Sequence, residues 1–212
     1  MWPPEALDFL RELEENNDRE WFKANRERYE RSLLAPAREL AERLGHLGQP
    51  HFFRPYNNLR FRPGPPLKEH VAVAIGYRSG GAYYFELSLD GLFVGAGLHH
   101  PAPDQLERFR AAIDDSRKAA GFERAVVTAE KAGLSLTEPE LKRAPRGYPN
   151  HHPRVERLRL KSITVSHRHP VEPWVHKPRC DQVVKSELDA AAPLVKWLAE
   201  TVGPSTLPRR GR

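Results

Sequence analysis

The segment VAVAIGYRSGGAYYFELSLDGLFVGAG, from Val71 to Gly97, constrains the fold more than any other part of the chain. Large apolar side chains alternate with small or polar ones over Val71–Tyr77 and again over Tyr83–Leu89, which is the period-two pattern of β-strands. Asp90-Gly91 is a strong signal for a two-residue hairpin, and it leads into a third strand over Leu92–Gly97. We therefore predict a three-stranded antiparallel meander.

Two further segments are predicted as strands. In Asn57–Arg62, Leu59 and Phe61 alternate with polar side chains, and LKSITVSH (Leu160–His167) has a similar pattern. The predicted sheet therefore has about four to five strands.

Helical patterns flank the strands along the sequence. Apolar residues recur at helical spacing after Pro4, and Asp18 is a good N-cap for a second helix. Gly121 is expected to end a helix that begins at Pro103, and Thr137 with Glu140 forms a capping box for a single turn. The other helices are expected from Pro36, over Phe122–Ala132, and from about Asp181 to about Val202.

These patterns predict an α+β fold in which an antiparallel β-meander packs against N-terminal, central and C-terminal helices. Residues 1–202 are expected to form a single domain, and residues 203–212 a disordered basic tail. No apolar run approaches the roughly 18 residues of a membrane helix, and the acidic N-terminal stretch lacks the features of a signal peptide. The single cysteine, Cys180, excludes an internal disulfide, so we expect a cytoplasmic protein with no membrane association.

The net charge of +6 favours an anionic partner, but the charge is not concentrated. Three of the 34 basic residues lie in the tail, which leaves 31 against 28 acidic residues in the rest of the chain. Most of these charges alternate along helices, as on solvated helix faces. Nucleic acid is therefore the less favoured partner.

Four stretches together resemble a known family. They are LEENNDREWFKANRERYE (13–30), LRFRPGPPLKEH (59–70), YYFELSLDGLFVGAGL (83–98) and LKRAPRGYPNHHPRVERLRLKS (141–162). They are similar to the uncharacterised bacterial family catalogued as domain of unknown function 2461, over nearly the whole chain. The resemblance implies a one-domain cytoplasmic protein and says nothing about an activity.

The chain departs from that family's pattern in one place. Members usually carry Arg-Asp before the apolar-Arg-Phe motif, a polar turn, and then Pro-Tyr-Lys, whereas this chain has Asn57 and Asn58 before LRF, PGP in the turn, and PLK at 66–68. An amide cannot act as a catalytic acid or base. Whether the chain is an enzyme therefore stays open.

The segment around that motif is the first candidate site. Arg60 and Arg62 project to one side of an extended chain, and Lys68 and His70 also share a side. Prolines stiffen the intervening turn, which lowers the entropy that is lost when a ligand binds. The other interpretation is an edge strand whose charges oppose aggregation.

A second candidate is the loop LKRAPRGY, where Arg143 and Arg146 accompany Gly147, whose backbone can approach an anion closely. Tyr148 could contact a ligand there or fill the core. Asn25, a polar residue on an otherwise apolar helix face, could bind a ligand or tie a loop to the helix.

Metal binding and covalent catalysis find little support in the sequence. His167 and His169 have strand spacing near Glu172, but no set of ligands has the spacing of a metal site. Cys180 at a helix start has no visible catalytic partner, and neither a nucleotide-binding loop nor a serine nucleophile motif is present. We predict no metal and no cofactor.

Two functional hypotheses follow. In the first, the protein binds a small anionic ligand bearing phosphate or carboxylate, through Arg60, Lys68, His70 and the loop of Arg143, Arg146 and Tyr148. In the second, it is a non-catalytic module that binds nucleic acid or a protein partner. The sequence identifies neither the ligand nor the oligomeric state.

Overall fold

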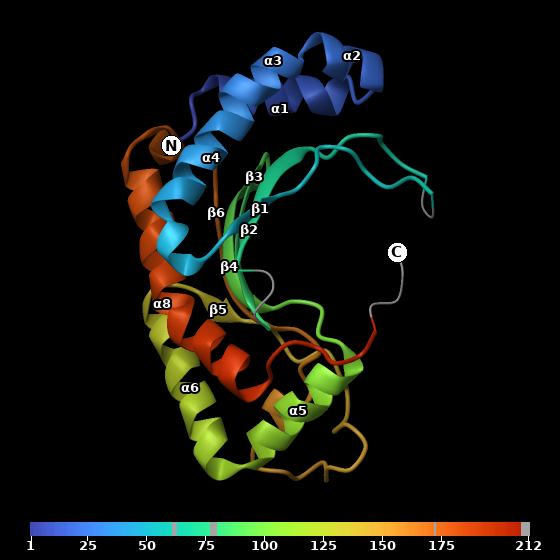
Figure 1. The fold of residues 1–212 in the computed structure, drawn as a ribbon, viewed down its shortest axis with the longest axis vertical. Helices are drawn as coiled ribbons and strands as arrows, with labels where there is room; N and C mark the ends of the chain where they lie inside the picture. Colours follow the sequence, from blue (N-terminus) through green and yellow to red (C-terminus); the bar gives the residue numbers. More distant parts are fainter. Residues whose placement is uncertain (61–62, 77–79, 172, 209–212) are drawn as a thin grey trace. The chain divides into compact units, whose positions relative to one another are not determined.

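A computed structural model describes residues 1–60, 63–76, 80–171 and 173–208 (Figure 1). Over these residues the chain combines helices with a six-stranded sheet in the order β1-β2-β3-β4-β6-β5. The fold class is α+β, as the sequence predicts. The strands are β1 (Pro50–Phe52), β2 (His70–Ile75), β3 (Ala82–Ser88), β4 (Gly91–Leu98), β5 (Ser135–Leu136) and β6 (Ile163–His169).

The predicted meander is confirmed for the described residues, because β2, β3 and β4 are consecutive neighbours in the sheet. Tyr77, with which the first predicted strand ends, lies outside the described residues. Their connections are too short for the crossover that parallel strands require. The hairpin turn between β3 and β4 depends on Gly91, whose φ is +134° and where an added Cβ would meet the carbonyl oxygen of His169. Glycine is therefore favoured at position 91 for two reasons: its positive φ, and the space that a side chain would need beside the His169 carbonyl.

The strand predicted over Asn57–Arg62 is wrong for the residues that the structure describes, since residues 57–60 are not in a strand and Phe61 and Arg62 lie outside the description. The edge strand is β1, which pairs antiparallel with β2. Asn57 closes a loop instead: its side-chain amide donates to the carbonyl oxygens of Pro65 and Leu67, at 2.9 and 3.0 Å. An asparagine side chain that bonds nearby carbonyls competes with a sheet ladder.

The helices are α1 (Glu5–Glu15), α2 (Arg19–Ala24), α3 (Arg26–Tyr29), α4 (Ala35–Arg43), α5 (Pro103–Asp114), α6 (Ser116–Lys131), α7 (Val155–Leu158) and α8 (Arg179–Thr201). Asp18 caps α2 as predicted, because its carboxylate accepts from the N–H groups of Glu20 and Trp21, both at 2.9 Å. Between α3 and α4 the chain forms a π-helical turn, η1 (Glu30–Leu34), and stays helical into Pro36.

Two helix boundaries differ from the prediction. Gly121 lies inside α6, whose N-cap is Asp115, and an added Cβ at Gly121 would lie 3.1 Å from the indole nitrogen of Trp197. A close packing partner, rather than a helix end, therefore accounts for this glycine. Thr137 and Glu140 form no helical turn: Thr137 donates to the carbonyl oxygen of Thr164, and Glu140 accepts from a backbone N–H that follows α7.

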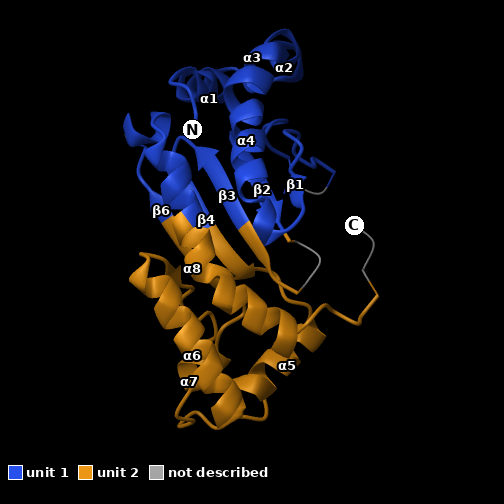
Figure 2. Cartoon of the chain, turned by 60° about the vertical axis from the view of Figure 1, so that its left-hand side comes forward, with its two compact units in different colours: residues 1–75, 84–94, 168–185 blue, residues 76–83, 95–167, 186–212 orange. Residues whose placement is uncertain are grey.

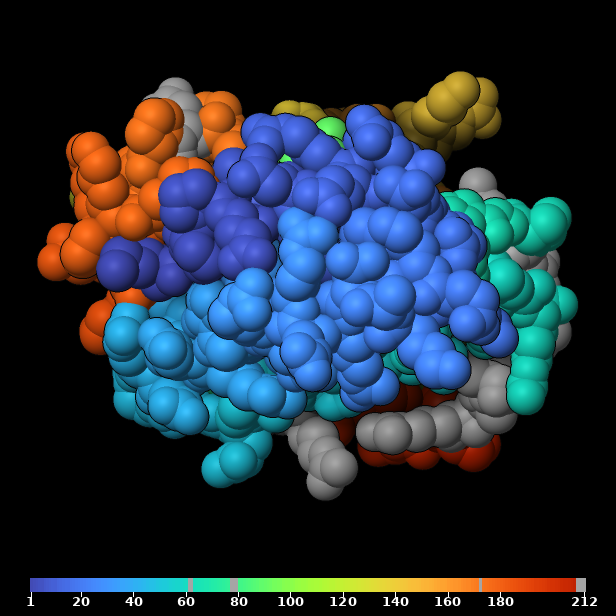
Figure 3. All heavy atoms as spheres, turned by 90° about the horizontal axis from the view of Figure 1, so that it is seen from above, coloured from blue at the N-terminus to red at the C-terminus, as the bar shows by residue number. Residues whose placement is uncertain are grey.

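Contacts divide the chain into two compact units (Figure 2). Unit 1 comprises residues 1–75, 84–94 and 168–185, and unit 2 comprises residues 76–83, 95–167 and 186–212. In unit 1, Phe9, Phe22 and Tyr29 pack ring against ring on α1–α3, and these helices form the blue part of the surface in Figure 3. In unit 2, Phe109, Phe122 and Trp197 form a second aromatic core.

Among the described residues, no helix has both the length and the apolar character that a membrane span requires. Within unit 2, the segment after α8 is bound to α5. Gln105 donates to the carbonyl oxygen of Gly203 at 2.8 Å, and Arg108 donates to those of Val202 and Pro204. Asp104 accepts from Ser205 and Thr206 at 2.7 and 2.8 Å.

We expect Asp104→Asn to loosen this segment. Burial raises the pKa of Asp104, but hydrogen bonds from Thr206, Ser205 and Arg108 together lower it by more. The pKa of Asp104 is therefore well below its ordinary value. The ionised carboxylate therefore stabilises the fold above its ordinary pKa, and this contribution is lost as the pH falls toward the folded-state pKa. At pH 7 the variant should exchange the Thr206 amide hydrogen several-fold faster, measured by mass spectrometry. Glu107→Gln, an exposed change on the same helix, is the control, and equal exchange in both variants would contradict the expectation.

Candidate functional site

Polar side chains gather on one face of the sheet in unit 1. Strand β3 buries Phe85 and Leu87 in the core, and its period of two therefore places Tyr84 and Glu86 on the opposite face. The side chains that join Glu86 there come from the start of β2 and the end of β6. We call this group the Glu86 cluster: Lys68, His70, Tyr84, Glu86 and Arg168.

The Glu86 carboxylate is the centre of the cluster, and its side chain is only 17% exposed. The Tyr84 hydroxyl donates to Oε2 at 2.5 Å. His70 Nε2 lies 3.8 Å from the same oxygen, and an Arg168 nitrogen lies 4.0 Å from Oε1. A carboxylate this sheltered from water needs such partners, because burial without them is costly.

Three aromatic side chains form a row beside this carboxylate. Ring centroids are 6.1 Å apart for Phe53 and Tyr84 and 5.9 Å apart for Tyr84 and Phe93, with steep interplanar angles. Lys68 Nζ lies 5.3 Å from the centre of the Phe53 ring, and the Arg168 guanidinium lies 5.0 Å from that of Phe93. This aromatic row (Phe53, Tyr84, Phe93) thus has a cation over the ring at each end.

Burial shifts the pKa of three side chains in the cluster. It lowers the pKa of His70 against the opposing effect of Glu86, and it lowers the pKa of Lys68 together with the nearby charge of Arg54. Burial and the hydrogen bond to Glu86 raise the pKa of the Tyr84 hydroxyl. Near neutral pH, His70 and Tyr84 are therefore uncharged hydrogen-bonding groups. Lys68 and Arg168 are the other basic side chains that interact with Glu86.

The structure brings together two residues that the sequence predicts for the first site, Lys68 and His70. Arg60 is exposed, and its backbone N–H donates to the Asn58 side chain at 3.3 Å. The charges that act on His70 are Glu86, Lys68 and Glu69, so Arg60 is not one of them. Its role in binding stays a prediction, and Arg62 lies outside the described residues.

The second predicted site lies in unit 2. Arg143 and Arg146 are exposed, and Gly147 has a φ of +94° with open space around the position of a Cβ. Tyr148 is half-buried, and burial followed by the charge of Asp114 raises its pKa. The loop is braced by Asn150, whose side-chain oxygen accepts from the Ala144 N–H at 3.0 Å. Anion binding by this loop stays a prediction.

Asn25 is engaged inside unit 1. Its amide nitrogen donates to the Trp21 carbonyl oxygen at 3.0 Å, and its oxygen accepts from Arg28 at 3.2 Å. Arg28 in turn makes a two-pronged pair with Glu12, at 2.7 and 2.9 Å. These contacts are those of a side chain that ties helices together, and ligand binding by Asn25 stays a prediction.

Cys180 and His167 carry side chains that could act as a nucleophile or as a metal ligand. Cys180 is buried, and burial raises the pKa of its thiol to about 11, so the thiol is protonated at neutral pH and is a poor nucleophile. In unit 2, His167 Nδ1 lies 2.8 Å from the buried Glu187 carboxylate, a partner that the sequence did not suggest. Both side chains belong to a group whose ligand atoms lie close enough together to hold a metal ion. The expected absence of metal therefore stays a prediction.

The residues that sequence reasoning missed are Phe53, Glu86, Phe93 and Arg168. The pattern of β3 does put Tyr84 and Glu86 on one face, which was the available signal. The identity of their neighbours depends on strand order, and β6 follows β4 in the sheet although more than sixty residues separate them.

Glu86→Gln tests whether the carboxylate controls the cluster. Because Glu86 favours the imidazolium, its removal should lower the pKa of His70 further. We would follow the His70 ring proton by NMR through a pH titration and assign it with His70→Asn. Glu69→Gln, the control, should produce a smaller fall, because Glu69 is the weaker of the two carboxylates that raise this pKa. An unchanged pKa in Glu86→Gln would show that the carboxylate does not control His70.

A comparison with protein-family models matches residues 5–197 to the family described as Conserved hypothetical protein (DUF2461). No curated protein and no solved structure matches the chain.

Proposed function

We propose that this chain, which belongs to the conserved hypothetical protein family DUF2461, binds a small anionic ligand on the Glu86 cluster and the aromatic row. One observation carries the proposal. Lys68 and Arg168 are held over the rings at opposite ends of the aromatic row, with hydrogen-bonding groups between them. Aromatic side chains beside a few convergent polar groups are typical of the lining of small-molecule sites.

Each part of the site has a distinct role in the proposal. Arg168 and Lys68 bind the phosphate or carboxylate group through charge-assisted hydrogen bonds. The rings beneath these cations restrict their motion, so less side-chain entropy is lost on binding. Tyr84, which lies between the two rings that carry the cations, provides a surface for a planar part of the ligand. Glu86 and the neutral His70 offer an acceptor and a donor that orient it.

The charge pattern favours a small ligand over a polymer. Glu86 acts on Lys68 and lies 4.0 Å from Arg168, and Glu69 lies close enough to act on His70. A continuous polyanion would meet both carboxylates, whereas one anionic group can contact a cation alone. The net charge of +6 supports the alternative, a module that binds nucleic acid or a protein partner. We also propose a cytoplasmic location, which suits the single thiol.

The test is calorimetric titration of adenosine monophosphate, inorganic phosphate and a 12-nucleotide oligomer into the protein. We expect the mononucleotide to bind more tightly than phosphate, because only the former covers the aromatic row. Lys68→Gln and Arg168→Gln should each weaken binding by about ten- to a hundredfold, since a charged hydrogen bond contributes about 1.5–3 kcal/mol. Arg11→Gln, which removes an exposed cation paired with Asp8, is the control.

Unchanged affinity in both variants would contradict the proposal. Binding that strengthens with oligomer length and weakens steeply with salt would favour the nucleic-acid alternative. Arg60→Gln decides the role predicted for Arg60 from the sequence. A loss comparable to that of Lys68→Gln would extend the site to Arg60, and an unchanged affinity would leave Arg60 outside it.

A further inference from the structure

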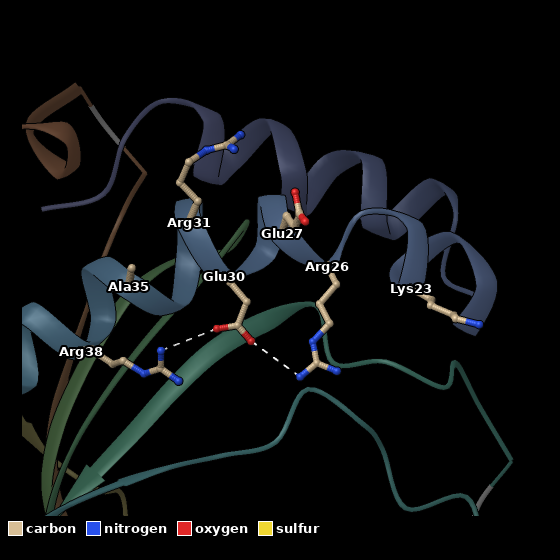
Figure 4. Close-up of a pocket in the computed structure, with 7 residues that line it drawn as sticks. All are labelled: Lys23, Arg26, Glu27, Glu30, Arg31, Ala35 and Arg38. Atoms are coloured by element: carbon tan, nitrogen blue, oxygen red, sulfur yellow. Dashed lines mark ion pairs between the residues drawn. The ribbon is translucent and has the colours of Figure 1, made fainter.

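A second group of cations lines a groove of ≈ 630 Å³ in unit 1, on a different set of elements from the Glu86 cluster (Figure 4). The groove runs along α2, α3, the π turn η1 and α4. Its volume is within the range of small-molecule sites. We call it the arginine groove, and it is lined by Lys23, Arg26, Glu27, Glu30, Arg31, Ala35 and Arg38.

Two arginines converge on one carboxylate in this groove. Figure 4 shows Arg26 and Arg38 extending toward Glu30 from opposite sides. The shortest nitrogen–oxygen distances are 3.8 Å for Arg26 and 3.7 Å for Arg38. Both exceed hydrogen-bond length, so Glu30 attracts the two guanidinium groups without using their N–H donors. Both guanidinium groups are therefore held beside Glu30 and can still donate to a ligand.

The remaining cations of the groove are directed elsewhere. Arg31 donates to Glu5 at 2.9 Å, which engages its guanidinium outside the groove. In Figure 4 the Lys23 side chain points away from Glu30. The pair of Arg26 and Arg38 is thus the part of the groove that offers two adjacent guanidinium groups to one anion.

The π turn produces this convergence. Glu30 and Arg38 are eight residues apart, and in a regular α-helix eight residues overshoot two full turns by about 80°. A π turn takes up one additional residue, so the rotation is close to that of seven residues, about 20° short of two turns. Because η1 begins at Glu30, it rotates Arg38 back onto the face of Glu30 and Arg26. Single π turns in α-helices occur frequently at functional sites.

We propose that Arg26 and Arg38 bind the phosphomonoester group of a small molecule. A phosphomonoester has several acceptor oxygens and can accept from both planar guanidinium groups at once. It carries close to two negative charges at neutral pH, more than the single charge of Glu30, and so competes with that carboxylate. Glu27 and Glu30 disfavour an extended polyanion, which would have to pass both.

Calorimetric titration of glucose 6-phosphate tests the proposal, with glucose as the ligand control. All proteins carry Arg168→Gln, so that binding at the Glu86 cluster is weakened throughout. Arg26→Gln and Arg38→Gln should each reduce affinity about tenfold. Both side chains are more than half exposed, at 65% and 55%, so these variants are expected to fold. Arg31→Gln is the matched control from the same groove and should change affinity less than about twofold.

In the Glu30→Gln variant, the direction of the change in affinity distinguishes two roles of Glu30. If Glu30 competes with the ligand, its removal should tighten binding of glucose 6-phosphate about threefold. If Glu30 only positions the arginines, the same change should weaken binding. The proposal is overturned if Arg26→Gln and Arg38→Gln bind like Arg31→Gln, or if Glu30→Gln does not bind more tightly. A phosphoserine peptide is the last arm, and binding of the peptide without binding of glucose 6-phosphate would overturn the small-molecule assignment.

Discussion

The two-residue period of β3 is the constraint on which the candidate site depends. Phe85 and Leu87 are fully buried, so the register of this strand in the sheet cannot shift by one residue without exposing both of them. That register fixes Tyr84 and Glu86 on the other face. Burial of these two apolar side chains, at roughly 1.5–3 kcal/mol each, thereby holds the partly buried Glu86 carboxylate in place.

The placement of Glu86 then determines what can surround it. Its hydrogen bond to Tyr84 lies along one strand, between residues i and i+2, and needs no long-range contact. The approach of His70 and Arg168 does need one, because they arrive from β2 and β6. The aromatic row crosses the sheet in the same way, since neighbouring strands bring side chains on one face within contact distance.

Local signals account for what the sequence predicted correctly. The alternation of the meander, the turn at Asp90-Gly91 and the Asp18 cap all act over a few residues. The two wrongly predicted helix boundaries lie where a distant partner determines the structure, whereas the wrongly predicted strand at Asn57 gives way to bonds within its own loop. Gly121 lies in α6 against Trp197, which follows it by 76 residues, and Thr137 bonds to Thr164 rather than capping a helix. The residues of the candidate site differ in the same way in how well the sequence predicts them. Lys68 and His70 could be predicted from the sequence, whereas Arg168 joins them only through the order of strands in the sheet.

In both the Glu86 cluster and the arginine groove, a glutamate lies close to arginine side chains. Two like charges about 4 Å apart repel by about 4 kcal/mol at an effective dielectric constant of 20, before solvent screening. In the arginine groove, Glu30 attracts Arg26 and Arg38 at 3.8 and 3.7 Å, which offsets that repulsion without hydrogen bonds to either. At the Glu86 cluster, Glu86 attracts the Arg168 guanidinium at 4.0 Å, also beyond hydrogen-bond length. Such long pairs contribute little stability when exposed. The arrangement therefore leaves the cations available, and it selects among anions, because an incoming group gains most when its charge exceeds that of the glutamate it competes with. At Glu30 a dianion meets that condition, whereas a chloride ion or a single carboxylate does not.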